Sequence, residues 1–280
     1  MSVKELLRRY GIHPSKGLGQ SFLQEEWVLE RILQASDLGP EDTVLEVGPG
    51  LGLMTRRLAE GSAAVVAVEL DRKMLSVLAE TLAGYPRAHI VQGDILQVDP
   101  VATITQALGL PSGHPLRYKV VANLPYYITS AALRHLLGAH PRPERLTVMV
   151  QREVAERIRA EPGNLSLLAI SVQVYGTVEL VCEVPARAFY PAPRVNSAVL
   201  RIDVHPQPRV PEQQMERFFR VVRAGFAQKR KKLRNSLAHN LGLRTDCVSA
   251  VLAGAGVSPH RRPETLSIEE WQRVAQDLPG

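Results

Sequence analysis

The chain has 280 residues, of which 45% are hydrophobic and 22% charged, and its net charge is +6. These values are typical of a globular protein, and no apolar run approaches the roughly 20 residues that a membrane-spanning helix needs. Its two cysteines, Cys182 and Cys247, lie in no CxxC or His-rich setting, which excludes a disulfide framework and a cysteine-based zinc site. The first residues also lack the apolar core of a secretory signal, and so few cysteines fit a reducing compartment, so we expect a cytoplasmic protein. We also expect no bound metal.

The first 36 residues are predicted to form a short helix, a loop and a second helix. Ser2 and Glu5 have the spacing of a capping box, so a basic helix should begin here and end near Tyr10. A glycine-rich loop over residues 13–20 follows, and then a helix over about residues 25–36.

Residues 43–150 alternate between short apolar runs and helical stretches. Two of these stretches, residues 71–83 and 129–137, begin at the plausible N-caps Asp71 and Thr129. Such alternation predicts an α/β fold, a Rossmann-like parallel sheet with helices on both sides. The apolar runs are suited to strands buried on both faces, and they are residues 43–47, 64–69, 89–92, 118–122 and 146–150.

The pattern changes after Glu161. Residues 165–175 and 197–203 are predicted to be long strands that are joined by a proline-rich segment, residues 185–193. Because nothing helical enough for a right-handed crossover lies between them, we expect an antiparallel pair at the edge of the sheet.

The remainder of the chain is predicted to be a separate helical domain. A proline-rich stretch over residues 205–211 has the character of a linker, and residues 212–278 contain no strong strand. We therefore expect a catalytic domain over residues 1–205 and a small all-helical domain over residues 206–280.

The strongest local signal is the glycine turn between Val44 and Gly52. A buried strand enters a turn in which Gly48 and Gly50 allow a ligand to approach the backbone without meeting a Cβ atom. The next strand ends at Glu69, 19 residues after Gly50, and a third strand is followed by Asp94. Both carboxylates should lie at the same edge of the sheet, where Glu69 could hold ribose hydroxyls. The alternative is a turn that merely needs glycine.

The spacing of this turn favours S-adenosylmethionine over NAD as the cofactor. It is GxGxG rather than GxGxxG, and Pro49 removes an N–H that could have bound a pyrophosphate. S-adenosylmethionine has no phosphate, and its hydroxyls and cationic end suit carboxylates and backbone carbonyls. An NAD-linked oxidoreductase remains the remoter alternative.

A candidate catalytic motif, Asn123–Tyr126, follows the strand at residues 118–122. The Asn123 side-chain oxygen and the Leu124 carbonyl could accept the two hydrogens of an adenine amino group, and Tyr126 could stack on the base. Methyl transfer to that nitrogen needs chiefly positioning and dipoles, with no strong base. The competing interpretation is a simple turn, because Asn and Pro favour turns.

A basic cluster in the C-terminal region predicts contact with a polyanion. It contains no acidic residue, whereas a solvated helix face would normally intersperse Glu or Asp. Its eight basic residues are Arg217, Arg220, Arg223, Lys229, Arg230, Lys231, Lys232 and Arg234.

Seven motifs make the chain resemble the small-subunit (16S) ribosomal RNA adenine N6,N6-dimethyltransferases, the KsgA/RsmA family, over nearly its full length. The resemblance implies that two adjacent adenosines near the 3′ end of this RNA are dimethylated within the immature small subunit. It also implies an enzyme that uses S-adenosylmethionine, and we take a monomer as the default. The motifs are residues 19–23, 46–50, 68–71, 93–94, 123–126, 189–195 and 226–237.

The resemblance also implies which residues form the site. Cofactor contacts are expected from Ser21, Leu23, Gly48, Gly50, Glu69, Asp94 and Asn123. The target base is expected among Asn123, Leu124, Pro125 and Tyr126, with Phe189 closing over its other face. The basic cluster, rather than the resemblance, predicts RNA contacts from Lys229, Arg230, Lys231, Lys232 and Arg234.

Two residues depart from the family pattern. Ser21 stands where the family usually has Asn, so an amide contact there would be shortened or replaced by water. Asn196 stands where Asp is common, and we attach no consequence to it.

Two other functions compete with small-subunit dimethylation. A methyltransferase of large-subunit 23S rRNA, of the antibiotic-resistance type, shares the glycine turn and the Asn-x-Pro-aromatic motif, but the C-terminal residues 226–237 and 266–271 resemble the small-subunit family. A non-catalytic ribosome assembly factor would have no need of Asn123, Pro125 and Tyr126.

Overall fold

The computed structural model describes residues 3–15, 17–111, 113–228 and 231–279. By their internal contacts these residues divide into two compact units. The first contains the chain up to Ala155 and Thr177–Val204, and the second contains Glu156–Gly176 and the chain from His205 onward.

The first unit contains a seven-stranded sheet in the order β4-β3-β2-β5-β6-β9-β7. The five strands from β4 to β6 run parallel, as the alternating pattern predicted. Their central residues, such as Val44 and Val120, have no exposed surface, which explains the continuous apolar runs. The bounds are β2 Thr43–Val47, β3 Ala64–Glu69, β4 Ala88–Gln92, β5 Tyr118–Asn123 and β6 Arg145–Gln151.

The antiparallel edge of the sheet is confirmed, but one of its two strands was assigned wrongly. Strand β9 (Ser197–Val204) pairs antiparallel with β6, and β7 (Gly176–Val184) lies beyond it. Residues 165–175, predicted to be a strand, instead contain helix α8 (Leu167–Gln173), whose N-cap Ser166 accepts a hydrogen bond from the Ala169 N–H. An apolar run buried on all sides has the same appearance in a helix as in a strand.

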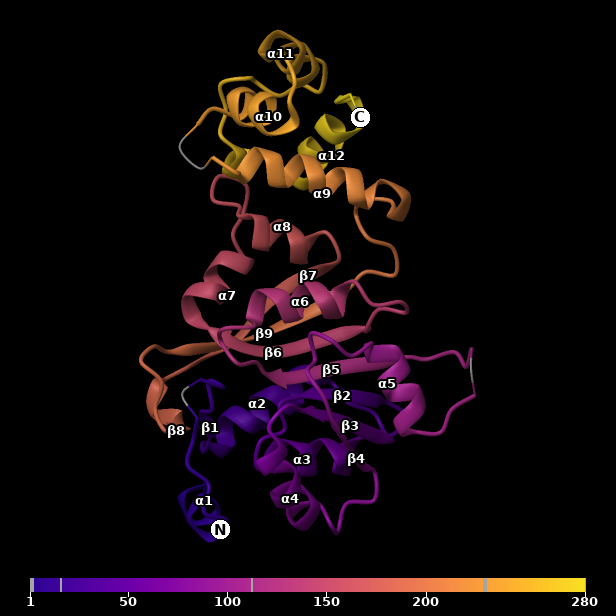
Figure 1. Ribbon diagram of the computed structural model, residues 1–280, viewed down its shortest axis with the longest axis vertical. Coiled ribbons are helices and arrows are strands. Elements are labelled where there is room, and N and C mark those ends of the chain that lie inside the picture. The colour runs from indigo at the N-terminus through magenta and orange to yellow at the C-terminus, as the bar shows by residue number, and fades with distance from the viewer. Residues whose placement is uncertain (1–2, 16, 112, 229–230, 280) are drawn as a thin grey trace. The chain divides into compact units, whose positions relative to one another are not determined.

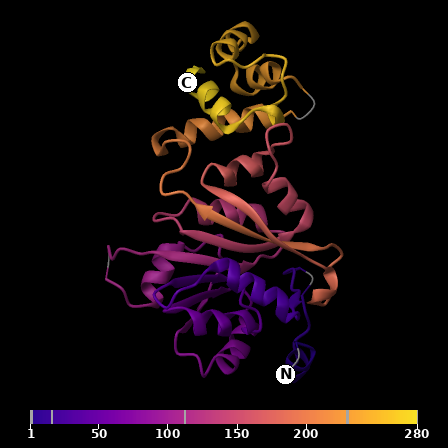
Figure 2. The same ribbon diagram turned by 180° about the vertical axis from the view of Figure 1, so that it is seen from behind.

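Helices cover both faces of this sheet. Figure 1 shows α5 (Pro100–Ala107) and α6 (Thr129–Leu137) in front of the strands, and Figure 2, seen from behind, shows α2 (Glu26–Ser36) in front of them. Asp71 caps α4 (Arg72–Thr81) as predicted, since its side chain accepts from the Lys73 N–H. The prediction that Thr129 caps α6 is wrong: Ile128 is the N-cap, and the Thr129 hydroxyl donates to the Pro125 carbonyl.

The N-terminal segment is attached to the sheet domain by a helix and a short ribbon. Helix α1 (Val3–Arg9) buries one apolar face together with Phe22, while Ser2, its predicted cap, lies outside the described residues. Strand β1 (Phe22–Leu23) pairs antiparallel with β8 (Phe189–Tyr190). Helix α3 (Leu53–Gly61) completes the unit and begins directly after the glycine turn.

The described residues of the second unit form helices joined by loops, apart from Gly176, the first residue of β7. Helices α9 (Glu212–Phe226), α10 (Leu233–Leu241) and α12 (Ile268–Asp277) pack near the fully buried Trp271, whose ring lies beside Phe226, and α11 (Thr245–Gly254) packs against α10. Residues 156–176 belong here because the backbone of Leu165 bonds to Glu264 and that of Tyr175 bonds to His205.

Candidate active site

A cavity of about 750 Å³ lies where the parallel strands of the first unit end. The carboxyl ends of β2, β3, β4 and β5 meet at one edge of the sheet, so the residues that follow these strands come together there. The cavity is lined by the Asn123–Tyr126 motif and by every residue expected at the cofactor: Ser21, Leu23, Gly48, Gly50, Glu69, Asp94 and Asn123.

The glycine turn after β2 forms one side of this cavity. Gly48 and Gly50 have φ angles of 69° and 55°, in the left-handed region that favours glycine. A Cβ atom at Gly48 would meet nothing within 4 Å, so this stretch of backbone is open to a ligand. A Cβ atom at Gly50 would lie 3.1 Å from the Phe22 ring, which packs closely over the turn.

Glu69 is held in a fixed position beside the turn. One of its oxygens accepts from the Gly50 N–H at 3.3 Å and the other from the Asp71 N–H at 2.8 Å. Glu69 is only 7% exposed, and this burial raises the pKa of its carboxyl. Asp94, half-buried, accepts from the Leu96 N–H at 2.9 Å and lines the same cavity.

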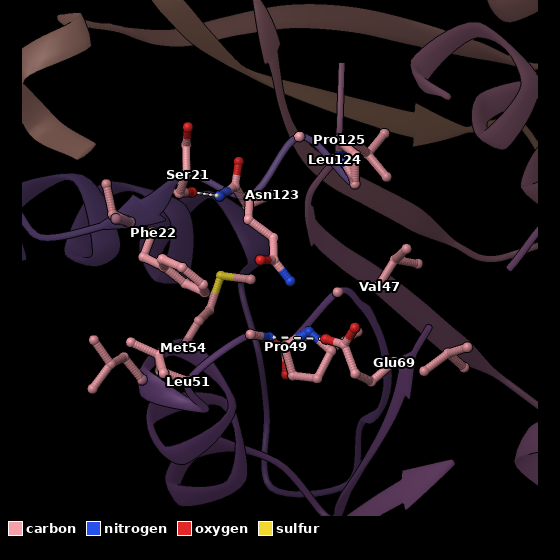
Figure 3. Close-up of a pocket in the computed structure, with 18 of the residues that line it drawn as sticks. Ser21, Phe22, Val47, Pro49, Leu51, Met54, Glu69, Asn123, Leu124 and Pro125 are labelled. Atoms are coloured by element: carbon pink, nitrogen blue, oxygen red, sulfur yellow. Dashed lines mark hydrogen bonds between the residues drawn. The ribbon is translucent and has the colours of Figure 1, made fainter. Parts of the chain in front are cut away.

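The Asn123 side chain faces the cavity from the end of β5. Its Nδ2 atom donates to the Ser21 carbonyl at 3.3 Å, an orientation that leaves Oδ1 available as an acceptor. Figure 3 shows this bond on one side of the pocket and the bond of Glu69 to the glycine turn on another.

The rest of the motif after Asn123 is fixed by its own contacts. The Leu124 N–H donates to the Met149 carbonyl, which sets the orientation of this peptide. The Tyr126 hydroxyl lies 2.6 Å from the hydroxyl of Ser197, which is fully buried on β9. Tyr126 lines the cavity, and burial raises the pKa of its phenol, which therefore stays neutral.

Comparison with known families agrees with this arrangement. The family described as "Ribosomal RNA adenine dimethylase" matches residues 13–278. The chain belongs to this family.

Relatives of this dimethylase family member cover nearly all of it. "Ribosomal RNA small subunit methyltransferase A" of Dehalococcoides mccartyi is 46% identical over 279 residues, 99% of this chain and 93% of that protein. The protein of the same name from Moorella thermoacetica is 43% identical and covers 98% of this chain and 95% of its own length.

Solved structures resemble the dimethylase fold as well. The 23S rRNA methyltransferase ErmE matches with a TM-score of 0.71 and 30% identity, over 92% of this chain and 99% of that one. A dimethyladenosine transferase from Plasmodium falciparum matches with a TM-score of 0.73 over 90% and 95% of the two chains, and at 22% identity it supports the fold alone. The sheet is therefore that of the class I methyltransferases.

One expected residue of the dimethylase site is not in the cavity. Phe189 is only 2% exposed and packs in the core with Val28 and Ile32. Its pairing with Leu23 through the β1–β8 ribbon places it behind the cavity wall. The prediction that its ring closes over the base rests on the family resemblance and not on this geometry.

Glu46 begins one of the seven motifs, but no role in the site was predicted for it from the sequence. It has no exposed surface, it lines the cavity, and neither carboxylate oxygen has a hydrogen-bond partner among the described residues. Burial raises its pKa to about 8, so the carboxyl is mostly protonated at neutral pH. The signal was present as an acidic residue within the apolar run of β2.

The basic cluster lies in the second unit and its members differ in their surroundings. Lys231 and Lys232 are exposed, whereas Arg217 is used to bond the carbonyls of Ala275 and Gln276 at the end of α12. The Nε atom of Arg234 is buried. Lys229 and Arg230 lie outside the described residues.

The described part of the chain has neither a candidate membrane-spanning helix nor a candidate metal cluster. None of its helices is both long and apolar enough to cross a bilayer. None of its His, Cys, Asp and Glu side chains gather into a group of three or more that could hold a metal ion.

Proposed function

We propose that this dimethylase family member transfers methyl groups from S-adenosylmethionine to N6 of two adjacent adenosines near the 3′ end of 16S rRNA. The single observation that supports this most strongly is that Gly48, Glu69 and Asn123 open into one cavity. Enzyme relatives named for the small ribosomal subunit, at 43–46% identity over nearly the whole chain, support the choice of substrate.

The residues beside the glycine turn fit this cofactor. Glu69 offers carboxylate oxygens to ribose hydroxyls, Asp94 offers one to an adenine amine, and the open backbone at Gly48 suits the methionine portion. Pro49 withholds an N–H from this turn, as expected where no phosphate is bound. When bound, S-adenosylmethionine supplies an electrophilic methyl group on a cationic sulfur.

The Asn123–Tyr126 motif would orient the target adenine. Its amino nitrogen is a poor nucleophile because the lone pair is delocalised into the ring. The Asn123 Oδ1 atom and the Leu124 carbonyl would each accept one amino hydrogen and direct the lone pair out of the ring plane, while Tyr126 stacks on the base. The described residues lining the cavity include no His, Lys or Cys that would act as a strong base, which suits a reaction that relies on positioning.

The helical region, residues 206–280, would hold the RNA through its exposed cations. Lys231, Lys232 and Arg234, with Lys229 and Arg230, would neutralise phosphates, and the partner would be rRNA in the immature small subunit, bound by a monomer. Replacing the four residues 229–232 with neutral ones should lower the salt dependence of RNA binding by about three units of slope. An unchanged slope would assign these residues to an ordinary solvated surface.

Mass spectrometry of nucleosides tests the proposed function directly. Unmodified small subunits incubated with the chain and S-adenosylmethionine should yield N6,N6-dimethyladenosine. The likeness to the 23S rRNA methyltransferase ErmE makes isolated large-subunit rRNA the necessary second substrate. Methylation of that RNA alone would contradict the proposal, and binding of small subunits without any methyl transfer would favour the assembly factor.

A further inference from the structure

One of the loops that line the cavity is held in place at Gln20 by three hydrogen bonds. We call residues 17–24 the roof segment, and most of it lines the cavity. The Gln20 N–H donates to the Ser15 carbonyl at 3.1 Å, and the Gln20 side-chain oxygen accepts from the Ser15 N–H at 2.8 Å. The remaining side-chain group, Nε2, donates to Asp71 Oδ2 at 2.8 Å. Gln20 therefore closes the turn of its own loop and links that loop to another element.

Asp71 lies in the turn between β3 and α4, two residues after Glu69, the carboxylate proposed to bind the ribose. Asp71 uses Oδ1 to accept the Lys73 N–H at the start of α4, and its own N–H donates to Glu69 Oε1 at 2.8 Å. Asp71 thus connects Gln20 to Glu69 through two direct hydrogen bonds.

The roof segment also reaches the base-binding half of the cavity. The residue after Gln20 is Ser21, whose carbonyl accepts the Asn123 side chain. A Cβ atom at Gly19 would lie 3.6 Å from the Tyr127 ring, so the segment passes close to the end of the catalytic motif. Gly19 and Ser21, on either side of Gln20, therefore lie near the proposed base site, while the Gln20 side chain bonds Asp71 beside the proposed cofactor site.

We infer that Gln20 is a positioning residue that holds the roof segment over the cofactor and keeps it in register with Glu69. This rests on the proposed function, because it assumes that Glu69 binds the cofactor. Without the Gln20–Asp71 bond, the roof must be ordered at the moment of binding, which weakens affinity. Loss of the bond should raise the dissociation constant and the KM for S-adenosylmethionine about tenfold, and change kcat much less.

The variant Gln20→Glu isolates this one bond. Its carboxylate still accepts from Ser15, but it places a negative charge within hydrogen-bond distance of Asp71 and removes the donor. At neutral pH the affinity for S-adenosylmethionine should fall at least tenfold. As the pH falls toward about 5, one proton shared by the two carboxylates restores a donor, so the affinity of this variant should recover relative to that of the wild type.

An exchange of partners separates positioning from general damage. Asp71→Asn alone should also weaken binding, because its amide oxygen is needed to cap α4 and its NH₂ group then faces that of Gln20. The double variant Gln20→Glu with Asp71→Asn reverses donor and acceptor, keeps a good N-cap, and should restore affinity to within about threefold of the wild type at neutral pH.

Calorimetric titration of S-adenosylmethionine into the full chain decides the matter, with melting temperatures to confirm folding. A wild type that binds no S-adenosylmethionine would refute the proposed function itself. A wild type that binds, with Gln20→Glu equal to it from pH 5 to pH 8, would overturn the role of Gln20. Loss in Gln20→Glu without rescue by the double variant would also overturn it, since a structural defect alone predicts that result.

Discussion

The two ends of the cavity differ in charge. The end formed by β3 and β4 offers the carboxyl groups of Glu69 and Asp94, whereas the end formed by β5 offers an amide, backbone groups and an aromatic ring. Carboxylates give strong hydrogen bonds to hydroxyl and amino groups that do not change during the reaction. The neutral end is suited to a group whose lone pair must be directed rather than deprotonated.

This difference separates binding from chemistry along one sheet edge. Changes at the acidic end should affect cofactor affinity, and changes at the neutral end should affect the rate of transfer. The roof segment is linked to the acidic end through Gln20 and Asp71 and to the neutral end through Ser21, so it is the part of the site where the two effects should mix.

The largest effect is expected for Asn123→Ala. Removing one oriented acceptor should lower kcat about 10²–10³-fold, while small-subunit RNA binding stays largely intact. Single-turnover methyl incorporation measures this, and Asn164→Ala, an exposed asparagine in the second unit, is the matched control. A variant with the wild-type rate would disprove the proposed role of the neutral end.

The buried Glu46 should make stability depend on pH. Its pKa of about 8 in the folded chain exceeds the ordinary value of 4.5, so the folded state retains a proton that the unfolded chain has released. The free energy of unfolding should therefore fall as the pH rises from about 5 to about 8, because over this range the folded state binds a proton that the unfolded chain has released.

Glu46→Gln removes this titration at nearly constant volume. Between about pH 5 and pH 8 the unfolding equilibrium constant of the wild type should rise by a factor on the order of 100 that is missing in this variant. Buried Glu69 has a raised pKa too and should preserve part of the slope. Urea unfolding at several pH values measures the difference, with the exposed Glu30→Gln as control. Parallel pH profiles for wild type and Glu46→Gln would contradict the assignment.

A smaller effect is expected at the acidic end. Glu69→Gln keeps the shape of the side chain but places an NH₂ group against one of its two backbone donors. The KM for S-adenosylmethionine should rise on the order of tenfold, with kcat changing by less than about threefold. Steady-state kinetics at saturating RNA separates the two constants, and a fall in kcat alone would mean that the two ends are not distinct.

The smallest effect is expected for Tyr126→Phe. The ring that stacks on the base remains, so kcat should change only about twofold to threefold, while the buried Ser197 hydroxyl loses its partner at a cost of about 1 kcal/mol of stability. Tyr126→Ala, which removes the ring, should cost about 1–3 kcal/mol of base stacking. Equal activity of the Phe and Ala variants would exclude a stacking role.

Much of the parallel sheet could be predicted because its signals are local. The bounds of β2 and β3 match the apolar runs, and the glycine turn lies where the sequence placed it. The fold class and the convergence of Gly48, Glu69 and Asn123 follow from the rule that parallel strands end at one edge. These parts of the prediction needed no knowledge of contacts between distant segments.

The remaining parts depend on contacts between distant residues. The Tyr126–Ser197 bond joins residues 71 apart and the Gln20–Asp71 bond joins residues 51 apart, so no local pattern reveals either. Helix α8 was predicted to be a strand because its apolar residues are buried on all sides. The neighbouring β7 carried a visible alternation, with Glu179 and Glu183 exposed between less exposed residues, that would have located it.

The β1–β8 ribbon has a consequence for how the chain matures during translation. Leu23 emerges from the ribosome early, but its partner Phe189 is made only after all six strands from β2 to β7. A nascent polypeptide that ends before residue 189 contains every parallel strand, yet its roof segment lacks this attachment. Methyl-donor capture should therefore begin late in synthesis, and truncated products should be poor competitors for the cellular pool of that metabolite.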